Sequence, residues 1–286
     1  MNWNDLWIPA LWFALLGLVF GLLLAIAARV FAVRTDPRVP AVRDALPGAN
    51  CGGCGYSGCD AYAEAVVRGE AAPNCCTAGG PETAAAVAAV MGVDAGQAIR
   101  MRAVVLCSGS GTRAVRKYRY EGAQDCLSAS RLSGGDKLCP NGCVGLGTCV
   151  AACRFDAITV RDGVAEVDPS RCTGCGACAA ACPKHIIRIL PADAPYVVAC
   201  SSVDNGKVTR SYCAVGCISC RLCEKNCGAG AIRVNDFVAS IDYALCVRCG
   251  KCASVCPRHI IRTDRIGEPV TVPASAQEPE DKFPES

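Results

Sequence analysis

Histidine is almost absent from this chain of 286 residues: His185 and His259 are the only two, and each follows a cysteine, a proline and a basic residue. The sequence also contains no phosphate-binding loop, no flavin motif and no nucleophile paired with a base. It therefore predicts no catalytic residue and no bound flavin or nicotinamide. We expect the two histidines to pack locally, near the cysteines that precede them.

Net charge is also low, at +3, and gives no support for nucleic acid as a partner. Acidic residues are missing from residues 6–33, where Arg29 is the only basic residue. An apolar run of this length is long enough to cross a bilayer as a helix. The absence of charge therefore indicates a membrane segment near the N-terminus.

This apolar run could be a cleaved signal peptide or an uncleaved anchor. A signal peptide has a basic start and a clean small-residue cleavage site, whereas here Asp5 precedes the run. The tryptophans near its start, Trp3, Trp7 and Trp12, suit a membrane interface. Basic residues occur at the end of the run and after it but not before it: Arg29, Arg34, Arg38 and Arg43. The sequence predicts a single-pass anchor at residues 1–33 in the inner (cytoplasmic) membrane, with residues 34–286 on the cytoplasmic side.

Cysteine, by contrast, is abundant, with 25 residues that come mostly in groups of three and four. Disulfide scaffolds of this density are usually short secreted chains, and pairing all of such closely spaced cysteines would be strained. Cysteines three residues apart are well placed to surround one metal centre. We therefore expect metal centres and a reducing compartment, the cytoplasm.

The cysteines form an internal repeat. A shift of 74 residues superimposes nine of them, and the tetrapeptide HIIR at 185–188 recurs at 259–262. Between the cysteine runs of the first repeat, alternating stretches at 157–161 and 164–168 flank Asp162-Gly163, which predicts a hairpin. The superimposed cysteines are Cys126, Cys139, Cys143, Cys149, Cys153, Cys172, Cys175, Cys178 and Cys182 on Cys200, Cys213, Cys217, Cys223, Cys227, Cys246, Cys249, Cys252 and Cys256.

The repeats carry C-x2-C-x2-C-x3-C runs, in which the fourth cysteine of each run binds the cluster of the other run. Zinc sites usually use separate C-x2-C pairs, so iron–sulfur clusters fit these runs better. The fourth site has Cys143, Cys149 and Cys182 but lacks a ligand, because Leu146 stands where the second repeat has Cys220. Three complete [4Fe–4S] sites are predicted: Cys217, Cys220, Cys223 and Cys256; Cys246, Cys249, Cys252 and Cys227; and Cys172, Cys175, Cys178 and Cys153.

A separate unit at residues 51–80 has Cys51, Cys54 and Cys59, with a fourth thiol from Cys75 or Cys76. Four thiolates again suit one [4Fe–4S] cluster. The helical pattern that follows, around ETAAAVAAVM, is expected to end at Gly92.

The fold class that follows is α+β, with one N-terminal transmembrane helix, a small four-cysteine [4Fe–4S] domain, and two tandem ferredoxin-like domains of the bacterial two-cluster type. The expected boundaries are an anchor at 1–33, a linker at 34–50, the four-cysteine domain at 51–80, a helical and basic connector at 81–125, ferredoxin-like repeats at 126–190 and 191–264, and a disordered tail at 265–286.

This combination of an anchor, the stretch GANCGGCGYSGCDAYAEAVVRGEAAPNCCTAGG and ferredoxin-type runs resembles the B subunits of Rnf complexes, the ion-translocating ferredoxin:NAD+ oxidoreductases. The resemblance covers nearly the whole chain and favours the extended form of these proteins, with two ferredoxin-like repeats. In that family the N-terminal unit ends in cysteine, two prolines and two glycines. The matching segment here is CTAGG at 76–80, which points to Cys76 as the ligand and leaves Cys75 as the extra cysteine.

The resemblance implies an electron-transfer subunit of a translocase, with no complete active site in this chain alone. Its partners would be the other membrane subunits and reduced, acidic ferredoxin. The direction of electron flow and the ion moved, Na+ or H+, depend on cluster potentials and on other subunits. Basic residues that could steer ferredoxin are Arg100, Arg102, Arg113, Arg116, Lys117, Arg119 and Arg131, and Lys184, Arg188, Lys225, Arg248, Lys251 and Arg258.

Two other functions fit parts of the pattern. One is an iron–sulfur subunit of a different membrane dehydrogenase, but such subunits typically lack the unit at 51–80. The other is a zinc-binding scaffold, which would be colourless after anaerobic purification, whereas an iron–sulfur relay would be brown and give an EPR signal on reduction.

Four cysteines remain after five clusters are assigned, and two arrangements are open. If Cys139 supplies the ligand missing at Leu146, the remaining set is Cys107, Cys126, Cys200 and Cys213. If Cys107 supplies it, the remaining set is Cys126, Cys139, Cys200 and Cys213. The cysteine count thus predicts five [4Fe–4S] clusters, and six if the remaining set also binds iron.

Overall fold

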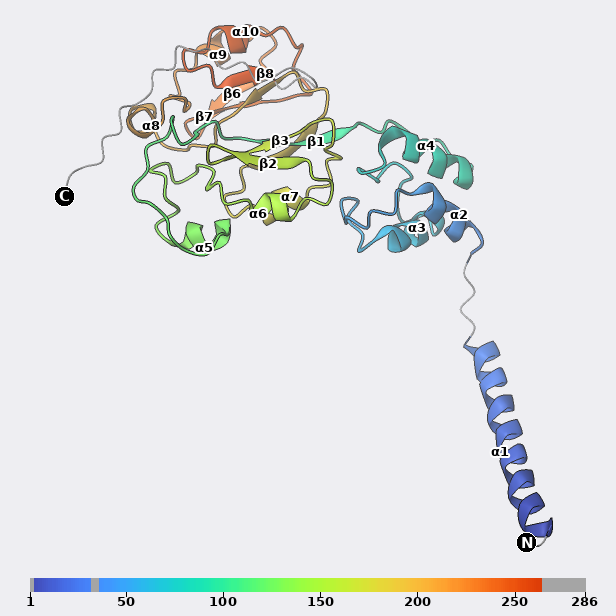
Figure 1. Cartoon of the computed structure of the whole chain (residues 1–286). Coiled ribbons are helices and arrows are strands. Elements are labelled where there is room, and N and C mark those ends of the chain that lie inside the picture. The colour runs from blue at the N-terminus through green and yellow to red at the C-terminus, as the bar shows by residue number, and fades with distance from the viewer. Residues whose placement is uncertain (1–2, 32–35, 264–286) are drawn as a thin grey trace.

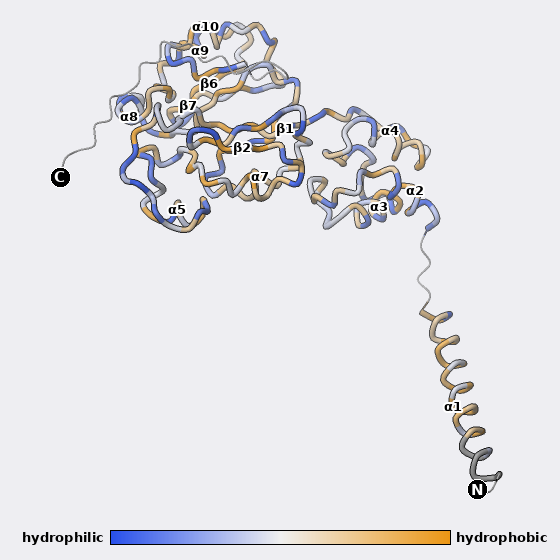
Figure 2. Tube along the Cα trace, in the orientation of Figure 1, coloured by the Kyte–Doolittle hydropathy of each residue, from blue (hydrophilic) through white to orange (hydrophobic). Residues whose placement is uncertain are grey.

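The computed structural model describes residues 3–31 and 36–263. Its first element is helix α1 (Trp3–Val30), in which Ala10–Val30 has the length and hydropathy of a membrane span. No part of that stretch is buried against the rest of the chain, and Figure 2 shows its apolar colour along the helix. Exposed leucine and phenylalanine side chains along a helix suit lipid better than water. The expected tail at 265–286 lies outside the described residues.

Three short helices form an N-terminal unit: α2 (Arg38–Ala45), α3 (Cys59–Val67) and α4 (Gly80–Met91). Val42, Tyr62 and Val87 are fully buried in their common core. Gly92 ends α4 in the left-handed conformation, φ 67°, as the sequence predicts. The linker expected at 34–50 instead contains α2, and Val42 in this helix and Leu46 just after it pack in the common core with α3 and α4.

The rest of the described chain consists of two similar units, which we call repeat 1 (residues 101–191) and repeat 2 (residues 196–263). Repeat 1 comprises β1 (Met101–Val105), α5 (Cys126–Arg131), α6 (Thr148–Ala151), β2 (Ile158–Arg161), β3 (Val164–Val167), α7 (Ala177–Ala181) and β4 (Ile187–Pro191). Repeat 2 comprises β5 (Tyr196–Val198), α8 (Gly206–Tyr212), α9 (Leu222–Lys225), β6 (Ile232–Asn235), β7 (Val238–Ile241), α10 (Lys251–Ser254) and β8 (Ile261–Thr263).

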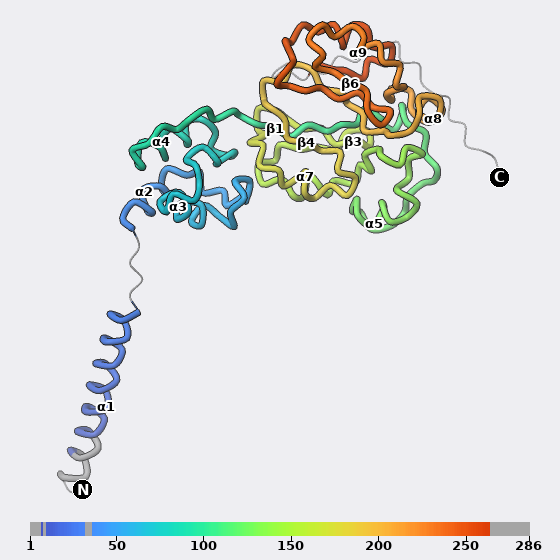
Figure 3. Tube along the Cα trace, turned by 180° about the vertical axis from the view of Figure 1, so that it is seen from behind, coloured from blue at the N-terminus to red at the C-terminus, as the bar shows by residue number. Residues whose placement is uncertain are grey.

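Each repeat contains two antiparallel strand pairs. The inner pairs, β2 with β3 and β6 with β7, are the hairpins that the sequence predicts, with Ile158 opposite Val167 and Ile232 opposite Ile241. The outer pairs, β1 with β4 and β5 with β8, join the first strand of a repeat to its last. Figures 1 and 3 show β1 leading from the N-terminal unit into this two-repeat body.

Strand β1 corrects the connector expected at 81–125. Its side chains are almost entirely buried, because β1 pairs with β4 and also contacts β3. Even Arg102 is only 3% exposed, and its guanidinium donates a hydrogen bond to the Ala194 carbonyl. Repeat 1 therefore begins at β1 and not at residue 126.

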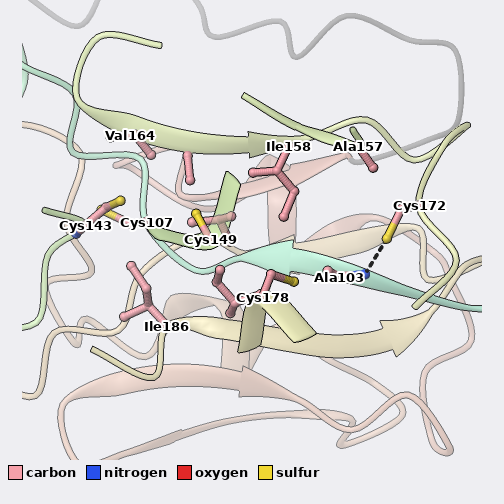
Figure 4. Close-up of a cluster of buried hydrophobic side chains, with 13 residues drawn as sticks. Ala103, Cys107, Cys143, Cys149, Ala157, Ile158, Val164, Cys172, Cys178 and Ile186 are labelled. Carbon is pink, nitrogen blue, oxygen red and sulfur yellow. Dashed lines mark hydrogen bonds between the residues drawn. The ribbon is translucent and has the colours of Figure 1, made fainter. Parts of the chain in front are cut away.

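The core of each repeat contains few large side chains and many thiols. In repeat 1, Cys107, Cys143, Cys149, Cys172 and Cys178 lie among alanine, valine and isoleucine (Figure 4). Repeat 2 has a core of the same kind. Since these cores are lined by sulfur, what the sulfur atoms bind decides how the repeats are held together.

Short backbone contacts join the two repeats. Ala114 and Cys213 form an isolated antiparallel bridge, and the Val115 amide donates to the Tyr212 carbonyl at 2.8 Å. The hydroxyl of Ser201 donates to the Leu106 carbonyl at 2.9 Å. Residues just after β1 and just after β5 therefore meet at the boundary between the repeats.

Candidate metal centres

Cysteine side chains gather in sets of four, and four of these sets line small cavities. Among residues 3–31 and 36–263, no three metal-binding side chains converge on one point, as a single ion would require. A [4Fe–4S] cluster makes a different demand, because each of its four thiolates binds a separate iron, so that the sulfurs surround a volume. The arrangement of the sets is therefore best judged by the cavities that they line.

The complete cysteine runs form three sets, as the sequence predicts. Set C (Cys153, Cys172, Cys175 and Cys178) lines a cavity under β1, and set E (Cys217, Cys220, Cys223 and Cys256) lines its counterpart in repeat 2. In set F (Cys227, Cys246, Cys249 and Cys252), burial raises the pKa of Cys252, and the thiols of Cys246, Cys227 and Cys249 raise it further. The structure thus brings the fourth cysteine of each run to the other run.

The site that lacks a ligand at Leu146 has a fourth thiol that the sequence did not predict. A cavity in repeat 1 is lined by Cys143, Cys149, Cys182 and Cys126, which we call set B. The Cys126 amide donates to the Thr148 hydroxyl at 2.8 Å, which holds α5 against the start of α6. The structure therefore places Cys126 in the position that the sequence assigned to Cys139 or Cys107.

Set D is formed by the four cysteines of the two repeats that remain, Cys107, Cys139, Cys200 and Cys213, which line a cavity between the repeats. This grouping differs from both sets that the sequence left open, since each of those included Cys126. The 74-residue shift gave no signal for it, because that shift superimposes Cys126 and not Cys107 on Cys200. The pairing of β1 with β4, which the sequence did not predict, brings Cys107 to the boundary between the repeats.

In the N-terminal unit, set A consists of Cys51, Cys54, Cys59 and Cys76. Burial raises the pKa of Cys76, and the thiols of Cys54, Cys59 and Cys51 raise it further. The Cys59 amide donates to the Asn50 side chain at 2.8 Å, which fixes the loop before α3. Cys75 lies near Tyr62, where it helps burial to raise the pKa of the phenol.

The thiols of these sets are buried close to one another. Burial, reinforced by neighbouring thiols of the sets, raises the pKa to about 11 for Cys149 and Cys223 and to about 12 for Cys178. Because each of these shifts includes contributions from thiols of the same set, the sulfurs of a set lie close together, as the four ligands of one cluster must. Donor type, donor number and cavity all fit [4Fe–4S] clusters.

Adjacent sets are in contact along the chain of sets A, C, B, D, E and F. The Cys143 amide of set B donates to the Cys107 sulfur of set D at 3.4 Å, and the Cys217 amide of set E donates to the Cys200 sulfur of set D at 3.4 Å. Sets C and B share a neighbourhood, because the Cys149 thiol contributes to the raised pKa of Cys178. Sets E and F interlock, since the run that contains α9 supplies Cys227 to set F and the run that contains α10 supplies Cys256 to set E.

The N-terminal unit contacts repeat 1 at set C. The Arg154 guanidinium, next to Cys153, donates to the carbonyls of Ala49 and Asn50 at 3.1 and 2.9 Å. Gly53 lies so close to Cys175 that an added Cβ would be 2.9 Å from its backbone. Set A therefore lies beside set C.

The two histidines differ from the expectation of local packing. His185 and His259 are exposed, with φ near 50°, and their amides donate to the carbonyls of Cys182 and Cys256 at 3.0 and 3.1 Å. They thus form the turn after the last cysteine of sets B and E, and their side chains point away from the core.

Family models match three stretches of the chain. A putative Fe–S cluster model matches residues 46–78, a 4Fe–4S binding domain matches 165–188, and a 4Fe–4S dicluster domain matches 216–261. These stretches contain set A, part of repeat 1 and most of repeat 2. The cysteines of set D lie outside all three.

Curated relatives cover most of the chain. The B subunit of the Na+-translocating ferredoxin:NAD+ oxidoreductase complex of Acetobacterium woodii is 47% identical over 91% of this chain and 79% of its own length. The B subunit of the ion-translocating oxidoreductase complex of Methanosarcina acetivorans is 42% identical over 86% and 94%. The B subunit of the proton-translocating ferredoxin:NAD+ oxidoreductase complex of Clostridium ljungdahlii is 42% identical over 87% and 89%. With identity and coverage of this extent, the chain belongs to the family of B subunits of the ion-translocating Rnf oxidoreductase complexes.

Proposed function

We propose that this iron–sulfur protein accepts electrons from reduced ferredoxin at repeat 2 and relays them through [4Fe–4S] clusters to its N-terminal unit and the membrane subunits. Ferredoxin:NAD+ oxidoreductase complexes are named for two of the relatives. Helix α1 anchors the chain as a single pass, and the basic residues that follow it favour the cytoplasmic side for the clusters. A cluster relay conducts both ways, so cluster potentials set the direction.

The observation that carries this proposal is the unequal exposure of equivalent cysteines. Cys249 in set F is exposed, whereas its counterpart in repeat 1, Cys175, lies against Gly53 of the N-terminal unit. Set F, at one end of the chain of sets, is thus open to a soluble donor, whereas set C is covered by the unit that follows the membrane helix and carries set A. A soluble protein can reach set F directly.

The open face differs from repeat 1 in charge as well as in exposure. Arg221, Lys225, Arg248 and Lys251 are exposed around sets E and F, with Leu245 and Val247 also exposed. At the equivalent positions repeat 1 has Gly147, Ala151, Gly174 and Ala177. Ion pairs with Glu224 and Asp193 only partly neutralise this face. Apolar and basic groups together suit an acidic ferredoxin.

Five clusters of this relay are assigned to sets A, B, C, E and F, which line or surround the sites described above. Set B gives the sharpest test, because its fourth ligand is Cys126. We expect Cys126→Ser to convert one [4Fe–4S] cluster into a three-iron form, detected by EPR of the oxidised protein. Cys75→Ser, outside all sets, is the matched control. An unchanged spectrum in Cys126→Ser would refute the assignment of Cys126.

The electron-accepting role is tested with the full-length chain, purified anaerobically with its clusters in detergent or nanodiscs. We expect mixing with reduced ferredoxin in a stopped-flow spectrometer to bleach the clusters at a rate that rises with ferredoxin concentration. The rate should fall steeply with added salt, because opposite charges steer the encounter. Clusters that dithionite reduces but ferredoxin does not would contradict the proposed donor.

A further inference from the structure

The four cysteines of set D belong to no family model and to no ferredoxin-type run, yet they meet in the middle of the molecule. We propose that Cys107, Cys139, Cys200 and Cys213 bind a sixth [4Fe–4S] cluster, which bridges the two repeats. This inference deepens the proposed relay by assigning the centre that joins its two halves.

The first argument is the symmetry of the set. Cys107 and Cys200 each stand two residues after the first strand of their repeat, and their neighbours Leu106 and Ala199 donate to the carbonyls of Ile186 and Ile260 at 2.8 and 2.9 Å. Cys139 and Cys213 each stand four residues before the first cysteine of a ferredoxin-type run. Each repeat therefore supplies one equivalent pair, and two pairs complete a four-thiolate site.

The second argument is the space between the sulfurs. The set D cavity has a volume of about 20 Å³, equal to those of sets B and E, and the set C cavity has about 10 Å³. Glycines face its sulfurs: an added Cβ at Gly109, Gly142 or Gly216 would be 3.6–3.7 Å from the sulfur of a set D cysteine. Gly142 and Gly216 are equivalent in the two repeats. The cavity is thus similar in size to those of the ferredoxin-type sets, and glycines stand beside its sulfurs.

The third argument is charge. Lys137 is only 3% exposed and lies in the wall of the cavity, where its ammonium donates to the carbonyls of Gly109 and Gly163 at 2.7 and 2.8 Å. The Arg258 guanidinium donates to the carbonyl of Cys213. Buried positive groups offset the negative charge of four thiolates around iron. Arg258 opposes the rise in the pKa of Cys213 in set D, and Lys137 does the same for Cys143 in the neighbouring set B.

The fourth argument is the position of the set in the relay. Backbone amides of Cys143 and Cys217 donate to the sulfurs of Cys107 and Cys200, so set D touches set B on one side and set E on the other. Amide hydrogen bonds to ligand sulfur are also a means by which proteins adjust cluster potentials. Among the described residues, set D provides the cysteines that connect repeat 1 to repeat 2.

Iron content tests the bridging cluster without reference to ferredoxin. Four irons per cluster predict about 24 irons per chain for the anaerobically reconstituted wild type, against about 20 if set D holds none. We expect the double variant Cys107→Ala/Cys200→Ala to lose about four irons and one reduced-cluster signal by EPR spin counting. Cys75→Ala is the control and should keep the full count.

Each outcome decides the question. Retention of about 20 irons in the double variant shows that the other five clusters, and hence the fold, are intact. If that variant unfolds and loses most of its iron, the wild-type count decides alone. A wild-type count of about 20, or an unchanged count in a folded double variant, would overturn the bridging cluster. Failure of ferredoxin as the donor would leave these counts unchanged.

Discussion

Replacing Lys225, Arg248 and Lys251 by glutamate is expected to lower the rate constant for cluster reduction by ferredoxin by about 10- to 100-fold at low ionic strength. The three side chains are exposed around sets E and F, the open end of the relay. Reversing them turns attraction of an acidic donor into repulsion, which acts mainly on the association rate. Stopped-flow bleaching at several salt concentrations measures the effect, which should shrink as salt is added.

The matched control reverses three exposed arginines that lie away from this face, Arg100, Arg119 and Arg131. It makes the same change in net charge, so a general effect of charge would slow both variants equally. We expect the control to retain nearly the wild-type rate. Equal slowing of both variants, or of the control alone, would contradict docking at repeat 2.

Substituting Gly53 by valine is expected to interrupt the relay at its other end. An added Cβ would lie 2.9 Å from the Cys175 backbone and 2.7 Å from the Thr77 hydroxyl, so the N-terminal unit must move away from set C. Overpacking of this kind costs about 1–3 kcal/mol, enough to shift a docking equilibrium roughly 5- to 150-fold. In the purified complex, ferredoxin-dependent NAD+ reduction should fall, while stopped-flow reduction of repeat 2 stays unchanged.

Gly228→Val is the control for this variant, because Gly228 is exposed, has no positive φ and has no atom within 4 Å of an added Cβ. Iron content should equal that of the wild type in both variants, which separates loss of contact from loss of clusters. Wild-type turnover in Gly53→Val would mean that electrons leave repeat 1 by a route other than its contact with set A.

Much of the molecule could be predicted from local patterns. The long apolar helix α1, the hairpin at Asp162-Gly163 and the end of α4 at Gly92 each depend on neighbouring residues, and the structure contains all three. Cysteine spacing within the ferredoxin-type runs likewise grouped sets C, E and F, because α-turns and short loops fix those distances.

The features that the sequence did not predict correctly depend on contacts between residues far apart in the chain. Cys126 was superimposed on Cys200 because both precede their run by the same number of residues, but α5 carries Cys126 to α6, while β1 carries Cys107 to the boundary. Arg102, counted with the steering charges, is buried by the pairing of β1 with β4. Lys184 and Arg258 also turn inward, to the carbonyls of Gly134 and Cys213.

The division of set D between the repeats has a consequence for biogenesis. Cys107 emerges early from the ribosome, but β4, which pairs with the strand just before Cys107, follows far later in the chain, and Cys200 and Cys213 later still. Sets A, B and C can each be completed from residues before 183, whereas a bridging cluster can be inserted only after residue 213 has been made. Cluster assembly would then act as a checkpoint on maturation, because only a chain with both repeats folded can close its central site.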